Sequence, residues 1–132
     1  MTHIYTGRYK HDSDIIYTWD GKHLYQGRYT NPSNIIYTFD GKHIYSGRYN
    51  NPSDIIFTFD GQHIYEGRYT NSSNITYTIG DKHIYRGRYK NDSEIRLTFK
   101  DDFIFSGRYN NPSDIMYNCN GRVPLIFFMT II

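Results

Sequence analysis

The chain has 132 residues and a formal net charge of +2, from 15 basic and 13 acidic side chains that are interleaved along its length. A chain of this size commonly forms one domain, and so small a net charge supplies no cationic field for neutralising phosphates, so nucleic-acid binding is not expected. Fifteen tyrosines, eight phenylalanines and the absence of alanine favour β-sheet over helix, because aromatic side chains suit a pleated surface.

The expected compartment follows from the cysteine count and the first residues. The single cysteine, Cys119, cannot form an intrachain disulfide, which is compatible with a reducing compartment. Residues 1–8 lack the apolar core of a signal peptide, and no apolar run is long enough for a transmembrane helix. We therefore expect a cytoplasmic protein with no transmembrane segment.

A period of twenty residues runs through the chain from its start. The tripeptide Gly-Arg-Tyr occurs six times, and each copy is followed four residues later by Ser, then an acidic residue or Asn, then Ile. The repeats span residues 3–22, 23–42, 43–62, 63–82, 83–102 and 103–122, and an apolar tail covers 123–132. The sequence therefore predicts a single repeat domain over residues 1–132.

Two turn signals divide each repeat into short strands. In the second and third repeats, Asp40-Gly41 separates strand-like runs at 35–39 and 42–45, which favours a two-residue type I′ hairpin turn with positive φ at both residues. The other connection, at residues 51–54, contains proline and short polar side chains that are typical of a type I turn. Two turns in each repeat predict about twelve short strands.

The predicted register assigns the side chains of a repeat to two faces. The face that is apolar in essentially every repeat, and that we interpret as the core, comprises Ile35, Tyr37, Phe39 and Ile44. The opposite face comprises Ile36, Thr38, His43 and Tyr45. Its first position becomes Thr76 and Arg96 in later repeats, and an unpaired buried arginine would cost several kcal/mol. We therefore expect this opposite face to meet solvent or to line a groove.

The fold class predicted is all-β, built from six hairpin repeats. A single sheet of hairpins would leave its apolar face uncovered, so the array must curl or close on itself. A hairpin stack or solenoid fits the Asp-Gly turns, and the alternatives are a flattened parallel β-solenoid and a closed barrel- or propeller-like ring.

The tail at residues 123–132 departs from the repeat and is almost wholly apolar. Ten residues are too few to cross a bilayer as a helix, which needs about twenty. We expect a final strand that covers the open end of the array or closes a ring, as terminal repeats commonly do. A membrane contact and an oligomer interface are the alternatives.

The candidate ligand-binding residues are the arginine and tyrosine of every Gly-Arg-Tyr. They are Arg8, Arg28, Arg48, Arg68, Arg88, Arg108, Tyr9, Tyr29, Tyr49, Tyr69, Tyr89 and Tyr109. Guanidinium groups beside flat aromatic rings could bind repeated anions or sugar hydroxyls. The structural alternative is that each arginine pairs with an acidic residue near a turn, such as Asp14 or Glu94, and covers a tyrosine ring.

The other repeated polar residues carry no comparable chemistry. A histidine column is formed by His3, His23, His43, His63 and His83, with Phe103 in the last repeat. One histidine per repeat does not supply the three or four convergent ligands of a metal site, so we expect no metal. Thr18 and its equivalents are interpreted as exposed strand residues. No catalytic motif or phosphate-binding loop occurs, so we expect neither an enzyme nor a cofactor.

The twenty-residue period, the Asp-Gly turns and the many aromatic residues resemble the choline-binding and clostridial-toxin cell-wall-binding repeats over residues 3–122. That resemblance is architectural and implies stacked hairpins that bind choline or sugars between neighbouring units. The pattern Ile-Tyr-x-Gly-Arg-Tyr followed by Ser-Asp-Ile is similar to small tandem-repeat β proteins.

The function expected from these features is a non-enzymatic, multivalent binding or scaffolding module. The first alternative is a repeat protein that binds carbohydrate or a cell surface through the arginine and tyrosine columns. Its expected partner is a carbohydrate or a protein surface. The second is a structural protein that self-associates as a homo-oligomer through the tail or through edge strands.

Overall fold

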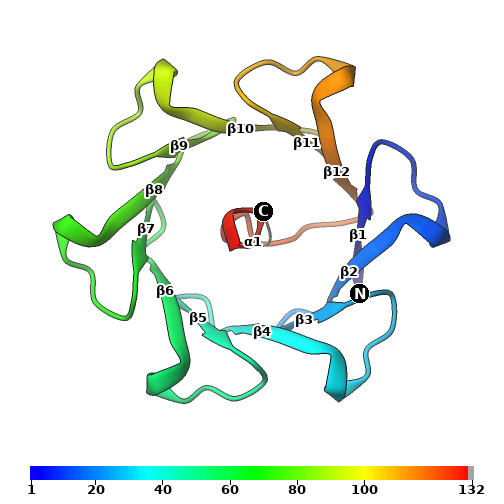
Figure 1. Cartoon of the computed structure of the whole chain (residues 1–132), viewed down its shortest axis with the longest axis horizontal. Coiled ribbons are helices and arrows are strands. Elements are labelled where there is room, and N and C mark those ends of the chain that lie inside the picture. Colours follow the sequence, from blue (N-terminus) through cyan, green and yellow to red (C-terminus); the bar gives the residue numbers. More distant parts are fainter. Residues whose placement is uncertain (131–132) are drawn as a thin grey trace.

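The computed structural model describes residues 1–130, which form a closed ring of antiparallel strands around a central tail (Figure 1). The strands are β1 (Thr2–Thr6), β2 (Ile15–Trp19), β3 (His23–Gln26), β4 (Ile35–Phe39), β5 (His43–Ser46), β6 (Ile55–Phe59), β7 (His63–Glu66), β8 (Ile75–Ile79), β9 (His83–Arg86), β10 (Ile95–Lys100), β11 (Phe103–Ser106) and β12 (Ile115–Cys119). Each strand pairs with its neighbours in sequence, and β1 pairs with β12 to close the barrel. The predicted all-β class and hairpin repeats are confirmed, and the closed ring rather than the open solenoid is the form adopted.

The short turn of each hairpin lies one residue later than predicted, which shifts the pairing of its two strands by two residues. Phe39 pairs with Ile44, and the only described non-glycine residue with positive φ is Asp101, so Gly41 (φ 97°) and Lys42 occupy the turn. Asp40 instead accepts hydrogen bonds through Oδ1 from the backbone N–H groups of Lys42 and His43, at 2.9 and 2.7 Å. The type I′ prediction is therefore wrong, because the aspartate acts as a side-chain acceptor rather than as a turn residue. A shift by two residues keeps the side chains on their predicted faces.

The predicted core is wrong at the start of each strand that follows a long connection, because a β-bulge lies there. In β6, for example, the second isoleucine of the strand, rather than the first, packs against the core. Ile44 pairs with Phe57 but Tyr45 pairs with Ile55, so Ile56 is the extra residue of the bulge. The bulge turns Ile56 toward the core, where it packs beside Phe57, while Ile55 does not belong to that cluster. At the equivalent position of β10, Arg96 stays exposed, which explains how the column tolerates an arginine.

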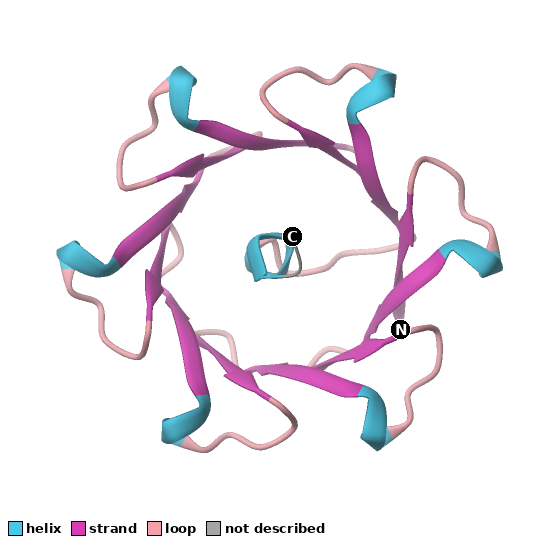
Figure 2. Ribbon diagram, viewed as in Figure 1, coloured by secondary structure: helices cyan, strands magenta, loops and turns pink. Residues whose placement is uncertain are grey.

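The long connections project outward from the ring and are called petals here (Figure 2). The petals are residues 7–14, 27–34, 47–54, 67–74, 87–94 and 107–114. Each ends in one 3₁₀ turn, at Asp12–Asp14, Pro32–Asn34, Pro52–Asp54, Ser72–Asn74, Asp92–Glu94 and Pro112–Asp114.

The petals cover the outer face of the barrel, which the sequence had assigned to solvent or a groove. Gly47 donates its N–H to the carbonyl of Ile36 at 2.9 Å and accepts a hydrogen bond from Thr38 at 2.8 Å. Thr38 is fully buried and Tyr45 is only 6% exposed. The expectation that these two residues face solvent is wrong, because Thr38 is bonded to the first residue of the petal that follows β5 and Tyr45 donates its hydroxyl to Asp40.

The tail forms a short helix inside the ring rather than a final strand. Helix α1 (Ile126–Thr130) lies in the centre of the barrel, and residues 126–129 are buried. Its first turn is closed by backbone bonds from Phe127 to Pro124 and from Phe128 to Leu125, both at 3.1 Å. Since β1 and β12 pair with each other, no strand edge is left for the tail, so its backbone must bond internally. Ile131 and Ile132 lie outside the described residues.

Aromatic side chains join the tail to the barrel wall. The Phe127 ring lies 5.0 Å from Trp19, 6.4 Å from Tyr37 and 5.8 Å from Phe39, measured between ring centroids. A barrel of about eight strands is filled by its own side chains, whereas twelve strands enclose a wider interior. The tail therefore supplies core that the repeats cannot supply themselves.

The structure bears on two expectations from the sequence, the absence of a transmembrane helix and self-association through edge strands. Among residues 1–130 no helix is long and apolar enough to cross a membrane. The prediction that copies of the chain associate through edge strands is wrong, because the closed sheet leaves no strand edge unpaired among the described residues.

Candidate functional site: the six petals

The petals place the predicted arginine and tyrosine residues on the rim of the ring, one pair per repeat. The glycine before each pair allows the chain to leave the barrel: Gly47 has φ of 83°, a region that side-chain-bearing residues rarely adopt. A Cβ at Gly47 would meet no atom within 4 Å, so the requirement is the backbone conformation rather than space. The six pairs are consequently presented in nearly identical conformations.

In every petal the guanidinium lies over the ring of the next tyrosine. The distance from the arginine Cζ to the ring centroid is 5.3 Å for Arg8, 5.1 Å for Arg28 and 5.0 Å for the other four. The tyrosines are 57–60% exposed and, apart from Met1, they are the exposed large hydrophobic residues among those described. Each petal therefore presents an aromatic surface beside a cation that is itself exposed.

The arginines of the petals are not held by ion pairs. Between residues 1 and 130 the salt bridges are Lys10 to Asp102 at 3.4 Å and Arg86 to Glu94 at 3.2 Å. The structural alternative is therefore wrong in pairing each petal arginine with an acidic turn residue, whereas its other part, an arginine that covers a tyrosine ring, is confirmed. Arg108 donates one hydrogen bond, from Nη2 to the hydroxyl of Tyr109 at 2.7 Å. Most guanidinium donors of the ring face solvent and could contact a ligand.

A polar relay that was not predicted from the sequence fixes five of the six petals to the barrel. His43 Nδ1 lies 3.0 Å from Thr58 Oγ1, and Thr58 donates its hydroxyl proton to the carbonyl of Gly67 at 2.8 Å. A hydroxyl has one proton, so the bond between the side chains must be donated by His43 Nδ1–H, which leaves Nε2 as the acceptor of the neutral ring. The histidine and threonine columns thus position the glycine from which the next petal begins.

The short turns have a second repeated polar contact. Tyr45 donates its hydroxyl to Asp40 Oδ2 at 2.8 Å. Burial, together with this bond to a carboxylate, raises the pKa of Tyr45 to about 12. Although burial alone would oppose its ionisation, the backbone bonds from His43 and Lys42 and the tyrosine hydroxyl lower the pKa of Asp40 below its usual value. The carboxylate is therefore a structural acceptor, bonded to residues of its own hairpin.

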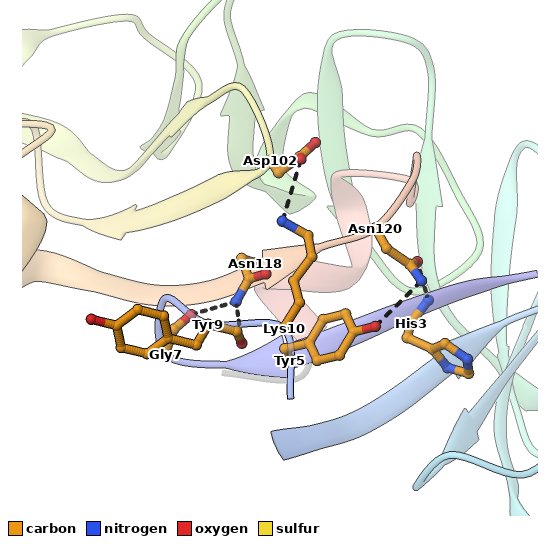
Figure 3. Close-up of polar contacts among 8 residues, drawn as sticks. All are labelled: His3, Tyr5, Gly7, Tyr9, Lys10, Asp102, Asn118 and Asn120. Atoms are coloured by element: carbon orange, nitrogen blue, oxygen red, sulfur yellow. Dashed lines mark hydrogen bonds and ion pairs between the residues drawn. The ribbon is translucent and has the colours of Figure 1, made fainter. Parts of the chain in front are cut away.

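The β11–β12 pair, which lies beside the seam between β1 and β12, has a different pair of residues in place of the histidine and threonine. Phe103 pairs with Asn118 at the position where His43 pairs with Thr58. The Asn118 amide donates to the carbonyls of Gly7 and Tyr9 at 2.8 and 3.1 Å (Figure 3). Asn118 Oδ1 is the one buried side-chain nitrogen or oxygen among the described residues with no hydrogen-bond partner. The two changes belong together, since Phe103 cannot donate where the histidine does.

Further contacts at the seam join residues from the two ends of the repeat region. Asn120 accepts the backbone N–H of His3 at 2.8 Å, and its amide lies 3.4 Å from the hydroxyl of Tyr5 (Figure 3). Lys10 forms its ion pair with Asp102 across the same seam. These bonds span more than ninety positions of sequence and fix the closure of the ring.

The described residues hold no cluster typical of a metal centre. No group of three or more His, Cys, Asp or Glu side chains within residues 1–130 could hold a metal ion. The five histidines of the column are separated by the repeat, and each of them is already hydrogen bonded to the threonine opposite it.

Comparison with known proteins identifies the family of the chain. The model of a family described as the 6-fold beta flower protein matches residues 4–132, so the chain belongs to that family. No curated protein and no solved structure matches the chain. The match agrees with the predicted small tandem-repeat all-β family, and nothing in it supports a relation to choline-binding repeats.

Proposed function

We propose that the chain is a non-enzymatic binding module with six equivalent sites, and that its ligand is a carbohydrate displayed repeatedly on a surface. The observation that carries the proposal is the ring of six exposed tyrosines, each with a guanidinium 5.0–5.3 Å from its centroid. Aromatic faces stack on the apolar faces of sugar rings, and guanidinium donors bind hydroxyls and carboxylates.

Repetition is the second support for this proposal. Each pair is exposed and shallow, so one petal alone would bind weakly. Six sites on one rigid ring can raise the apparent affinity by about 10²–10⁴ where the ligand repeats at a matching spacing. A single active site would instead require residues that differ from one repeat to the next, whereas the petal pairs are the same in all six.

The test is binding to immobilised acidic and neutral polysaccharides as the number of intact petals is reduced. Replacement of tyrosine by alanine in one, three and six petals should lower retention progressively, with the largest losses after the third. In a single petal, Arg48→Ala should weaken binding, while Lys42→Ala removes an equal charge from the exposed short turn and should not. Equal losses in those two variants, or full binding by the six-tyrosine variant, would refute the proposal.

A scaffolding role is the second candidate, and the same petal pairs would contact protein rather than sugar. Arg and Tyr are enriched at the energetic centres of protein interfaces, which favours this candidate over self-association through the tail. The polysaccharide panel separates the two: a scaffold should bind no glycan while the Tyr49→Ala variant still loses its protein partner. Light scattering across a concentration range tests whether that partner is a second copy of the chain.

A further inference from the structure

We propose that the barrel contains a second and separate binding site, a cavity beside the tail that takes a small planar aromatic molecule with one polar end. This site lies in the barrel interior, at the end of the barrel where the short turns are. It shares no residue with the petal pairs.

The cavity has the size and wall of a small-molecule site. Its volume is about 980 Å³, and its walls include Trp19, Phe99, Ile104 and Phe128. Binding sites for small organic molecules commonly enclose about 300–1,000 Å³ and are lined mainly by apolar and aromatic side chains. A smaller hollow of about 520 Å³ on the other side of Pro124 also borders Trp19.

The tail fills the barrel unevenly, which leaves this space. Phe127 contacts Trp19, Tyr37 and Phe39, on β2 and β4. Phe128 is 6.1 Å from Tyr117, again measured between ring centroids. The cavity lies beside these contacts, toward the interior residues of β10 and β11. Twelve strands enclose more room than one five-residue helix occupies.

The repeat changes at several positions that line this cavity. The interior position that ends every second strand is Trp19, Phe39, Phe59, Ile79, Phe99 and Cys119. Cys119 is the smallest of the six, and the volume that a phenylalanine would fill becomes part of the cavity. Asp101, also on the wall, replaces a turn glycine and is the only described non-glycine residue with positive φ, at 55°. Strained backbone of this kind is commonly kept where it serves a site.

The charged residues at the mouth of the cavity would bind the polar end of the ligand. Asp101 and Arg122 are exposed there and carry opposite charges, while the third charged residue, Asp102, pairs with Lys10. A hydroxyl or amide can bond to either group, whereas a net charge on the ligand would be repelled by one of them. The aromatic walls then receive the rest of the molecule.

Binding in this cavity is non-covalent. Burial raises the pKa of the Cys119 thiol to about 12, so the thiol is protonated at neutral pH. A protonated thiol is a poor nucleophile and behaves as a small apolar wall residue.

The experiment is a titration of the full chain with 2-naphthol, followed by calorimetry and by the NMR signal of the Trp19 indole. Trp19 is the only tryptophan and borders the cavity, so its signal reports on this site. The expected result is saturable binding with a shift of the indole signal. The variant Cys119→Phe restores the residue of three other repeats, fills the space, and should weaken binding at least about tenfold.

Two further variants make the test decisive. Leu125→Trp fills the cavity from the tail side and should also abolish binding, which covers the case in which Cys119→Phe does not fold. Arg48→Ala, in a petal, should bind 2-naphthol as the unaltered chain does. Absence of any saturable shift, or unchanged binding in folded Cys119→Phe or Leu125→Trp, would overturn the inference and leave the petal proposal untouched.

Discussion

Replacing Phe103 by histidine should stabilise the protein, because it supplies the hydrogen-bond donor that the seam lacks. In the other five repeats the equivalent histidine donates from Nδ1 to a threonine hydroxyl at 2.9–3.0 Å. Phe103, on β11, faces Asn118 on β12, whose Oδ1 is buried without a partner. Both neighbours of the amide nitrogen are carbonyls, so Oδ1 cannot exchange places with it.

The magnitude follows from two opposing terms. A buried acceptor without a partner costs about 1–3 kcal/mol, which the new bond should largely recover. The substitution also changes the contact in which Lys10 Nζ lies 5.8 Å above the Phe103 ring, worth about 0.5–1 kcal/mol at an exposed site. The expected net gain in the free energy of unfolding is about 1 kcal/mol, or about 4 °C in Tm for a domain of this size.

The assay is urea denaturation at pH 7 of Phe103→His in two backgrounds, the unaltered chain and Asn118→Val. Valine has no acceptor, so in that background the histidine should lose its benefit, and the coupling energy between the two sites should be about 1 kcal/mol. The reasoning fails if Phe103→His has the same effect in both backgrounds, or if it destabilises the unaltered chain.

Three other predictions concern the tail and the short turns. Phe127→Ala should lower the free energy of unfolding by about 3–5 kcal/mol in urea denaturation, because the fully buried ring joins the tail to the barrel wall; an effect below 1 kcal/mol would mean that the tail is not core. Gly41→Val should cost about 1–3 kcal/mol through its positive φ, while Lys42→Val, with negative φ, should cost less; equal Tm values would contradict the turn assignment. Replacing Asp20, Asp40 and Asp60 together by Asn should flatten the acid limb of the stability curve. Their folded-state pKa values are lowered, so their contribution is present above about pH 4 and is lost as the pH falls through those values; an unchanged acid midpoint would refute this.

The repeat, the strands and most of the residues that face the barrel interior could be predicted, because they depend on local sequence patterns. The twenty-residue period and the alternation of Tyr37, Phe39 and Ile44 follow from side-chain periodicity alone. The predicted turn lies one residue before the observed one, because Asp-Gly can supply either two turn residues or an acceptor followed by a turn glycine. The backbone bonds to Asp40 distinguish these cases, and a sequence does not display them.

Closure and burial of the outer face could not be predicted, because both depend on contacts between distant residues. Thr38 looks like an exposed strand threonine until the petal that covers it is in place. One signal was available: histidine and threonine fifteen positions apart recur in five repeats, and both change in the sixth, to Phe103 and Asn118. Residues that change together in a repeat are expected to be in contact, and this pair is.

The Gly-Arg-Tyr of the petals is identical in all six repeats, whereas the barrel interior differs from one repeat to another, and the two proposed sites lie in these two parts. A binding array requires identical units, and the six petals retain Gly-Arg-Tyr without exception although neighbouring positions vary. In a closed ring at least one repeat must differ from the others, because the two ends of the repeat region meet there and the tail enters the barrel from it. Asn118, Cys119 and Asp101 supply those departures within β12 and the adjoining turn, where they do not alter the petals. Because a cavity with its own chemistry arises at that break, the symmetric and asymmetric parts of the molecule can serve two different ligands.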